Sequence, residues 1–303
     1  MDKVQDVFSP DIYVRERPRE GKTRALEQLK NEVELPKKLG EGEHPHIIRN
    51  ARTYERGQQY GIFLTPTATR DLSKLLASRT DAQRSPGFLL RAFSCLNLTL
   101  EYIHKRQVRH KDVKPKNILS VESGPDEGII WTDFSNAYGY DDGGEVTYEE
   151  AVLSCKYAAP EVVEPGFPFR NAHGKSSDIF SLGCVFIDLL CIFIGGDQLD
   201  SVFGEDENRI PFSKNIEQIR TSIDGHLRNP QLSADIRPLL QLSKKMIQRK
   251  SSGCPKIQQV VQTLSAEWEK YFCNRCNDLL MKAEVRKETG GGMTSWFLGW
   301  FRH

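Results

Sequence analysis

The sequence lacks the features that mark secreted, membrane-spanning or strongly charged proteins. Its 303 residues carry 42 basic and 41 acidic side chains, a formal net charge of +1, so bulk charge gives no reason to expect a nucleic-acid partner. The N-terminus has no apolar stretch of the kind that a secretory signal needs. The longest apolar run, residues 185–194, is interrupted by Asp188 and is shorter than about 18 residues, so we expect no transmembrane segment.

A disulfide framework is also missing. The seven cysteines are odd in number and scattered, most of them in apolar surroundings, which is typical of a reduced, intracellular protein, cytoplasmic or nuclear. Cys273 and Cys276 form a lone C-x-x-C pair with neither a second pair nor a histidine nearby in the sequence. We therefore expect no zinc at this pair.

What is present is a ten-residue stretch that carries chemistry, HKDVKPKNIL at residues 110–119. It places a carboxylate (Asp112), a lysine two residues later (Lys114) and an amide five residues later (Asn117) in one short loop before an apolar strand. Phosphoryl transfer needs these three types together: a carboxylate to orient the attacking hydroxyl, an ammonium beside the phosphate, and an oxygen ligand for Mg²⁺. The stretch therefore predicts a phosphoryl-transfer site.

This stretch resembles the catalytic loop H-R-D-L-x-x-x-N of eukaryotic protein kinases, with Lys111 in place of the usual arginine. The lysine at position 114 is typical of the serine/threonine type. The resemblance implies that Asp112, Lys114 and Asn117 are catalytic, that Lys114 also contacts ATP, and that Asn117 is a ligand of Mg²⁺. ATP and Mg²⁺ are the cofactors that it implies.

Three more segments resemble this family and follow in its order. Residues 133–135 read DFS, like the D-F-G segment; residues 154–161 read SCKYAAPE, like the T-x-x-Y-x-A-P-E block; and residues 176–183 read SSDIFSLG, like S-D-x-W-S-x-G. The resemblance implies that Asp133 binds Mg²⁺ and the nucleotide. It also implies that Asp178 anchors the backbone of the catalytic loop.

The small lobe is predicted from residues 12–67. A strand near 12–17, a helix over 23–39 that we expect Pro36 to kink or shorten, and a strand near 60–64 lead to a hinge. In the kinase frame, Glu32 is the candidate ion-pair glutamate of the helix, and Leu64 takes the gatekeeper position. Thr65 and Thr67 would then contact the adenine of ATP.

The resemblance breaks at the start of this lobe. No glycine precedes Gly21, so the glycine-rich loop over the phosphates is missing, and we expect the first two strands of the lobe to be missing with it. The lysine of the third strand is replaced by Arg15, Glu16 or Arg17, depending on the alignment, and Lys22 is a candidate substitute. Either the protein is a degenerate kinase, or the chain is part of a longer one that carries the missing strands.

The activation segment, residues 136–153, is rich in glycine and acid. Thr147 and Tyr148 are candidate phosphorylation sites, and Lys111 is placed to pair with a phosphate there; an unmodified polar loop is the alternative. Ser154 takes the hydroxyl position that in serine/threonine kinases bonds the catalytic Asp and Lys.

The family arginine that pairs with the A-P-E glutamate, here Glu161, is replaced by Cys254, so we expect this partner to be lost unless Arg249 reaches it. The aromatic end of the chain, residues 296–303, could pack back on the large lobe, contact a partner or a membrane surface, or stay disordered.

Together these patterns predict an α+β, protein-kinase-like bilobal fold with an incomplete small lobe and a mainly helical large lobe. The predicted parts are a flexible N-terminus (1–11), a partial small lobe (12–67), a large lobe (68–272) and a partly disordered tail (273–303). The predicted function is a protein serine/threonine kinase acting on protein hydroxyls. The alternatives are a pseudokinase that serves as a binding or scaffold module, and a fragment of a longer active kinase.

Overall fold

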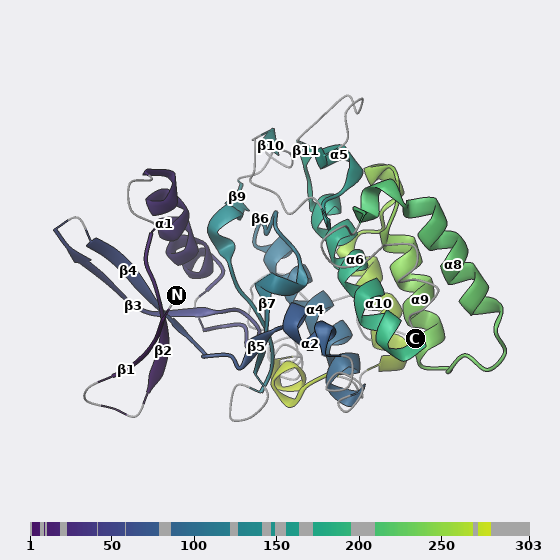
Figure 1. Ribbon diagram of the computed structural model, residues 1–303, viewed down its shortest axis with the longest axis horizontal. Coiled ribbons are helices and arrows are strands. Elements are labelled where there is room, and N and C mark those ends of the chain that lie inside the picture. The colour runs from purple at the N-terminus through teal and green to yellow at the C-terminus, as the bar shows by residue number, and fades with distance from the viewer. Residues whose placement is uncertain are drawn as a thin grey trace, which may run out of the picture.

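The computed structural model describes residues 2–6, 9, 11–18, 23–40, 42–57, 59–78, 86–121, 127–140, 147–148, 156–163, 172–194, 210–268 and 272–279. It has two lobes, a small one built on a twisted sheet and a larger one built on helices (Figure 1). The elements are β1 (Asp2–Gln5), β2 (Ile12–Glu16), α1 (Thr23–Lys38), β3 (Arg49–Arg56), β4 (Gln59–Thr65), β5 (Arg70–Asp71), α2 (Leu72–Ala77), α4 (Pro86–Lys105), β6 (Val108–Arg109), η1 (Pro115–Asn117), β7 (Ile118–Val121), β8 (Gly128–Trp131), η2 (Phe134–Asn136), β9 (Tyr138–Gly139), β10 (Thr147–Tyr148), α5 (Pro160–Val163), β11 (Ala172–His173), α6 (Lys175–Ile194), η4 (Phe212–Lys214), α8 (Ile216–Arg228), α9 (Ile236–Met246), η5 (Ser251–Gly253) and α10 (Ile257–Trp268).

The small-lobe sheet has four antiparallel strands in the order β1-β2-β4-β3. Our expectation of a flexible N-terminus with no strand before residue 12 is wrong, because β1 pairs with β2 from Asp2↔Arg15 to Gln5↔Ile12. Oδ2 of Asp2 also forms ion pairs with Nη2 of Arg15, at 3.1 Å, and with Nη2 of Arg17, at 3.2 Å. Pairing satisfies backbone groups that a polar segment cannot satisfy alone, so the strand forms although its own sequence favours it weakly.

Helix α1 packs beside this sheet and faces the large lobe (Figure 1). It contains Pro36 and continues to Lys38, so the proline does not shorten it. Its buried side, with Leu29, Val33 and Leu35, matches the apolar stripe that predicted the helix.

The large lobe is assembled around α6, whose residues from Ser177 to Cys191 are all buried. Among the described residues, α6 is the one helix long and apolar enough to cross a membrane by length and composition, but 83% of that stretch is buried inside the protein, as in a core helix. Gly183 brings α6 close to α9, because a Cβ at this position would lie 2.7 Å from Cβ of Met246.

The loops that carry the predicted chemistry lie between short strands at the junction of the lobes. Strands β7 and β8 are antiparallel and pair from Ile118↔Trp131 to Val121↔Gly128. Strands β6 and β9 pair with one another and frame the catalytic loop. The architecture is the α+β, two-lobed arrangement that the sequence predicted.

Candidate active site

The catalytic loop is held by one buried carboxylate of the core helix. Asp178, in the first turn of α6, accepts hydrogen bonds from the backbone N–H groups of His110 and Lys111 and from Nε2 of His104, each at 2.9 Å. Burial alone would raise the pKa of Asp178, but the hydrogen bond from His104 and its charge outweigh burial and hold that pKa below its ordinary value. The anchoring contact predicted for Asp178 is confirmed.

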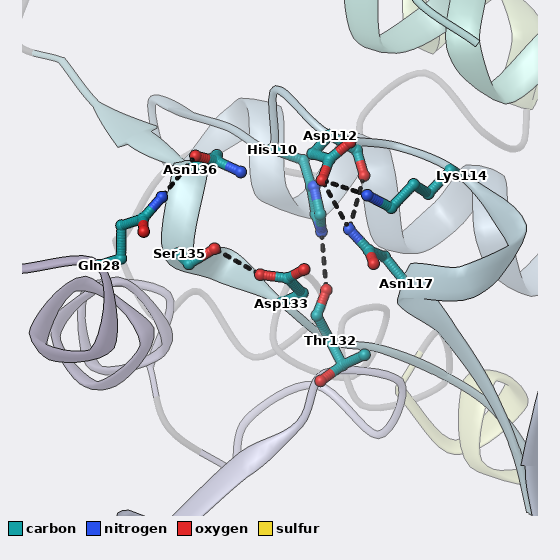
Figure 2. Close-up of polar contacts among 9 residues, drawn as sticks. All are labelled: Gln28, His110, Asp112, Lys114, Asn117, Thr132, Asp133, Ser135 and Asn136. Carbon is teal, nitrogen blue, oxygen red and sulfur yellow. Dashed lines mark hydrogen bonds and ion pairs between the residues drawn. The ribbon is translucent and has the colours of Figure 1, made fainter. Parts of the chain in front are cut away.

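Three predicted catalytic side chains converge inside this loop (Figure 2). Nζ of Lys114 lies 2.6 Å from Oδ2 of Asp112. Nδ2 of Asn117 donates to the backbone carbonyl of Asp112 at 2.9 Å and to its Oδ2 at 3.2 Å. Asp112 and Asn117 are buried and Lys114 is half-buried, so the cation and the amide fix the direction of the carboxylate.

Asp133 lies across from this group, where the chain leaves β8 and enters η2 (Figure 2). Its backbone is in the left-handed region, with φ 60° and ψ 63°, a conformation that Asp adopts more readily than most residues. The hydroxyl of Ser135, in the place of the family's glycine, donates to Oδ1 of Asp133 at 2.5 Å. Nε2 of His110 contacts the carbonyl of Thr132 at 3.1 Å and joins the two segments.

Two residues of α1 that the sequence did not indicate hold the D-F-S segment. Nδ2 of Asn31 lies within hydrogen-bonding distance of three carbonyls, those of Phe134 (3.2 Å), Ser135 (3.1 Å) and Ala137 (2.8 Å). Gln28 donates to Oδ1 of Asn136 at 3.3 Å. A polar residue on a helix face carries no sequence signal for such a contact. These bonds couple the position of α1 to that of Asp133.

The structure also decides which residue takes the place of the family's strand lysine. It is Glu16, at the end of β2, whose half-buried side chain faces Glu32 and Asp133. Arg15 and Arg17 are paired with Asp2 instead. We call Glu16, Glu32 and Asp133 the acidic cluster.

The electrostatics of the acidic cluster follow from burial and from like charges. Burial first, and the negative charge of Asp133 second, raise the pKa of Glu16 to about 7. The same two causes, with Glu16 added, raise the pKa of Glu32 well above its ordinary value, although backbone groups of Phe134 and Asp133 hydrogen-bond to it. Glu32, predicted to pair with a lysine, thus faces carboxylates. The substitute Lys22 lies outside the described residues.

The predicted hinge follows β4. Leu64, in the gatekeeper position, is buried at 4% exposure, and Thr65 pairs with Arg49 of β3. Thr67 is half-buried in the connection to β5. The adenine contacts of Thr65 and Thr67 stay a prediction.

Cys254 stands where the family has the arginine that pairs with Glu161. Glu161 and Cys254 lie close enough that, after burial, the charge of Glu161 is the next cause that raises the pKa of the Cys254 thiol, to about 12. Burial raises the pKa of Glu161 too, despite a 3.5 Å hydrogen bond from Ser176. Arg249 donates to the carbonyl of Ser213.

The structure describes only part of the predicted activation segment. Thr147 and Tyr148 form β10 and pair with β11, so this part of the segment has regular structure. Ser154 lies outside the described residues. Phosphorylation of Thr147 or Tyr148 stays a prediction.

Oxygen donors of the kind that Mg²⁺ prefers are present at the junction of the lobes. The carboxylate of Asp133 and the side-chain amide of Asn117 supply them, and the neighbouring carboxylates of the acidic cluster add negative charge that a divalent cation would offset. The donor set fits Mg²⁺.

Comparison with known proteins agrees with this geometry. The protein kinase domain profile matches residues 13–264. The chain is 30% identical over 166 residues to calcium/calmodulin-dependent protein kinase cmkA of Emericella nidulans, covering 53% of this chain and 36% of that protein. It is 31% identical over 158 residues to ribosomal protein S6 kinase alpha-1 of Mus musculus, covering 49% and 20%. It is 28% identical over 166 residues to calcium/calmodulin-dependent protein kinase type 1 of Macrobrachium nipponense, covering 54% and 44%.

Each match spans less than half the length of the relative. The profile, in contrast, covers most of this chain, and it includes the catalytic loop, the D-F-S segment and the anchoring helix. The chain therefore belongs to the protein kinase family.

Proposed function

We propose that this protein transfers the γ-phosphoryl group of ATP to serine or threonine hydroxyls of proteins. The observation that carries the proposal is the convergence of Asp112, Lys114 and Asn117 in a loop that Asp178 anchors. A loop fixed by buried hydrogen bonds keeps its catalytic groups in one arrangement, which is the main contribution of a protein to this reaction.

The residues take distinct parts in this reaction. Asp112 orients the substrate hydroxyl and accepts its proton as the new O–P bond forms and the bond to the β–γ bridging oxygen breaks. Lys114 balances negative charge beside Asp112, and Asn117 holds that carboxylate through Nδ2. Asn117 and Asp133 would hold Mg²⁺, which neutralises phosphate charge when bound. Thr65 and Thr67 would contact the adenine.

A second function is favoured by a specific observation, the acidic cluster. ATP brings several negative charges, and Glu16 stands where the family places a cation for them. A chain with this substitution could keep the kinase fold as a pseudokinase, a binding or scaffold module for other proteins. The scattered free cysteines suit an intracellular setting for either function.

Binding of Mg²⁺-ATP, measured by calorimetry, tests the catalytic proposal. We expect binding by the full chain, loss of binding in Asp133→Ala, and unchanged binding in Glu217→Gln, a matched control that alters an exposed carboxylate on α8. A kinase assay with general protein substrates then compares the full chain with Asp112→Ala. No binding at millimolar nucleotide would contradict catalysis and leave the pseudokinase function.

A further inference from the structure

Four metal-ligating side chains from distant parts of the chain meet where α4 and residues 272–279 lie against the segment before β3. They are His46, Cys95, Cys273 and Cys276, and we call them the cysteine–histidine cluster. His46 lies 227 residues before Cys273, and Cys95 lies 181 residues before Cys276. We expected no zinc at the C-x-x-C pair because no histidine or further cysteine lies near it in the sequence, and the fold supplies both.

The ligand atoms are as close together as one ion requires. All four lie within 4.8 Å of one another. Nε2 of His46 is 3.1 Å from Sγ of Cys273 and 3.1 Å from Sγ of Cys276, and the sulfurs of Cys276 and Cys95 are 3.8 Å apart.

These separations can be compared with a tetrahedral zinc site. Zn–S and Zn–N bonds of about 2.3 and 2.05 Å give S···S separations of about 3.8 Å and N···S separations of about 3.6 Å. The sulfur pair already matches, and the imidazole needs to move by only a few tenths of an ångström.

The histidine is oriented by a second hydrogen bond. Nδ1 of His46 lies 2.6 Å from the carbonyl of Ile129, a group that can only accept, so Nδ1 carries the proton. Nε2, the ring nitrogen that faces the sulfurs of Cys273 and Cys276, is then the one available to a metal ion. A carbonyl that fixes the other ring nitrogen is the usual support of a metal-binding histidine.

The C-x-x-C segment is also fixed in place. Nη1 of Arg275 donates to the carbonyl of Pro45 at 3.2 Å, and Nη2 donates to the carbonyl of Glu127 at 2.7 Å. The backbone N–H of Cys276 donates to Sγ of Cys273 at 3.4 Å, a bond that favours the thiolate. Gly128, with φ +136°, leaves room here, since a Cβ on it would lie 3.2 Å from Nη2 of Arg275 and 3.4 Å from Cε1 of His46.

The surroundings of the cluster favour an ion over an empty site or a disulfide. His46, Cys95 and Cys276 are almost fully buried, and Cys273 is half-buried next to a cavity of about 450 Å³ that gives access to it. A disulfide bond between Cys273 and Cys276 would leave the buried side chains of Cys95 and His46 with nothing to bind. Three thiols and an imidazole in a tetrahedral arrangement select Zn²⁺ over Mg²⁺ or Ca²⁺.

We propose that His46, Cys95, Cys273 and Cys276 bind one Zn²⁺ ion in a closed, structural site. Four protein ligands leave no open position for a substrate, so the ion holds the fold together. It fastens residues 272–279, which include a short helix at 274–279, to α4 and to the segment that leads into β3. Figure 1 shows this short yellow helix at the lower edge of the view, beside the large lobe.

The metal content of the full chain tests the proposal. The chain is expressed with added zinc, dialysed against EDTA to remove loosely bound metal, and analysed by mass spectrometry of the elements. We expect one zinc per chain, and at least a tenfold loss of zinc in Cys95→Ser and in Cys276→Ser. Cys254→Ser is the matched control, because that cysteine lies outside the cluster and a serine can keep its hydrogen bond to the carbonyl of Met246.

A second measurement covers variants that fail to fold. Zinc is removed from the wild-type chain by a stronger chelator, and Co²⁺ is added in its place. We expect the intense visible absorption of tetrahedral cobalt together with sulfur-to-cobalt charge transfer in the near ultraviolet, and both bleach when one equivalent of Zn²⁺ is added. A folded wild-type chain that binds neither metal, or a Cys95→Ser chain that keeps its zinc, would overturn the assignment.

Discussion

The acidic cluster predicts a pH-dependent stability that one substitution removes. Glu16 has an ordinary pKa near 4.5, which burial and the charge of Asp133 raise to about 7 in the folded protein. The folded state therefore binds a proton at Glu16 that the unfolded state releases, and stability falls as pH rises from about 4.5 through about 7. The difference between the pKa of about 4.5 in the unfolded chain and about 7 in the folded one corresponds to about 3 kcal/mol of stability lost above pH 7.

The substitution Glu16→Gln isolates this contribution. Glutamine has nearly the shape of a protonated glutamate and cannot ionise, so the variant and the wild type should be about equally stable at pH 4.5. At pH 8 the variant should be more stable by about 3 kcal/mol. Urea unfolding of both chains at a series of pH values measures the difference, and titrating groups outside the acidic cluster cancel because they are shared.

The control for this prediction is a glutamate that is exposed in the folded protein. Glu217→Gln alters an exposed carboxylate on α8, and its stability should differ from that of the wild type by the same small amount at pH 4.5 and pH 8. If Glu16→Gln and wild type had the same urea midpoint at pH 8, the pKa of Glu16 would not be raised in the folded protein, and the reasoning from the acidic cluster would be refuted.

Three further changes test other parts of the structure. Asp178→Ala leaves two loop amides and a buried histidine without their acceptor, so it should cost about 3–5 kcal/mol in urea unfolding and abolish phosphoryl transfer; a cost under about 1 kcal/mol would contradict the anchoring role. Gly183→Ala adds a Cβ 2.7 Å from that of Met246 and should destabilise the protein by about 1–3 kcal/mol despite better helix propensity, as its melting temperature would show. Ser135→Gly frees Oδ1 of Asp133 and should tighten Mg²⁺-ATP binding by about two- to tenfold in calorimetry, whereas weaker binding would mean that the serine helps to orient Asp133.

The large-lobe chemistry could be predicted because its residues are close together in sequence. Asp112, Lys114 and Asn117 share one loop, and their spacing indicated their convergence before the distances were known. Asp178 lies in a different segment, but it belongs to a motif with a known place in the family, so its contact with the catalytic loop was also predicted correctly.

The other contacts of the site and of the cysteine–histidine cluster depend on which strands and helices pack together. The residue types alone do not determine this packing. The choice of Glu16 over Arg15 or Arg17 follows from the register of β2 with its neighbours. The bonds of Asn31 to the D-F-S segment and the meeting of His46 with three cysteines need the whole fold. Strand β1 forms because β2 offers it an edge, which its own polar sequence does not show.

The pairing of β2 with β1 and β4 also sets the sign of the charge that the small lobe turns toward the catalytic loop. Alternate residues of a strand face opposite sides, so Val14 and Glu16 point inward while Arg15 and Arg17 are held outward by Asp2. A shift of β2 by one residue against both β1 and β4 would exchange a carboxylate for a guanidinium beside Asp133. The ion pairs of Asp2 with Arg15 and Arg17 therefore help to keep a carboxylate, and not a guanidinium, on the side of β2 that faces Asp133.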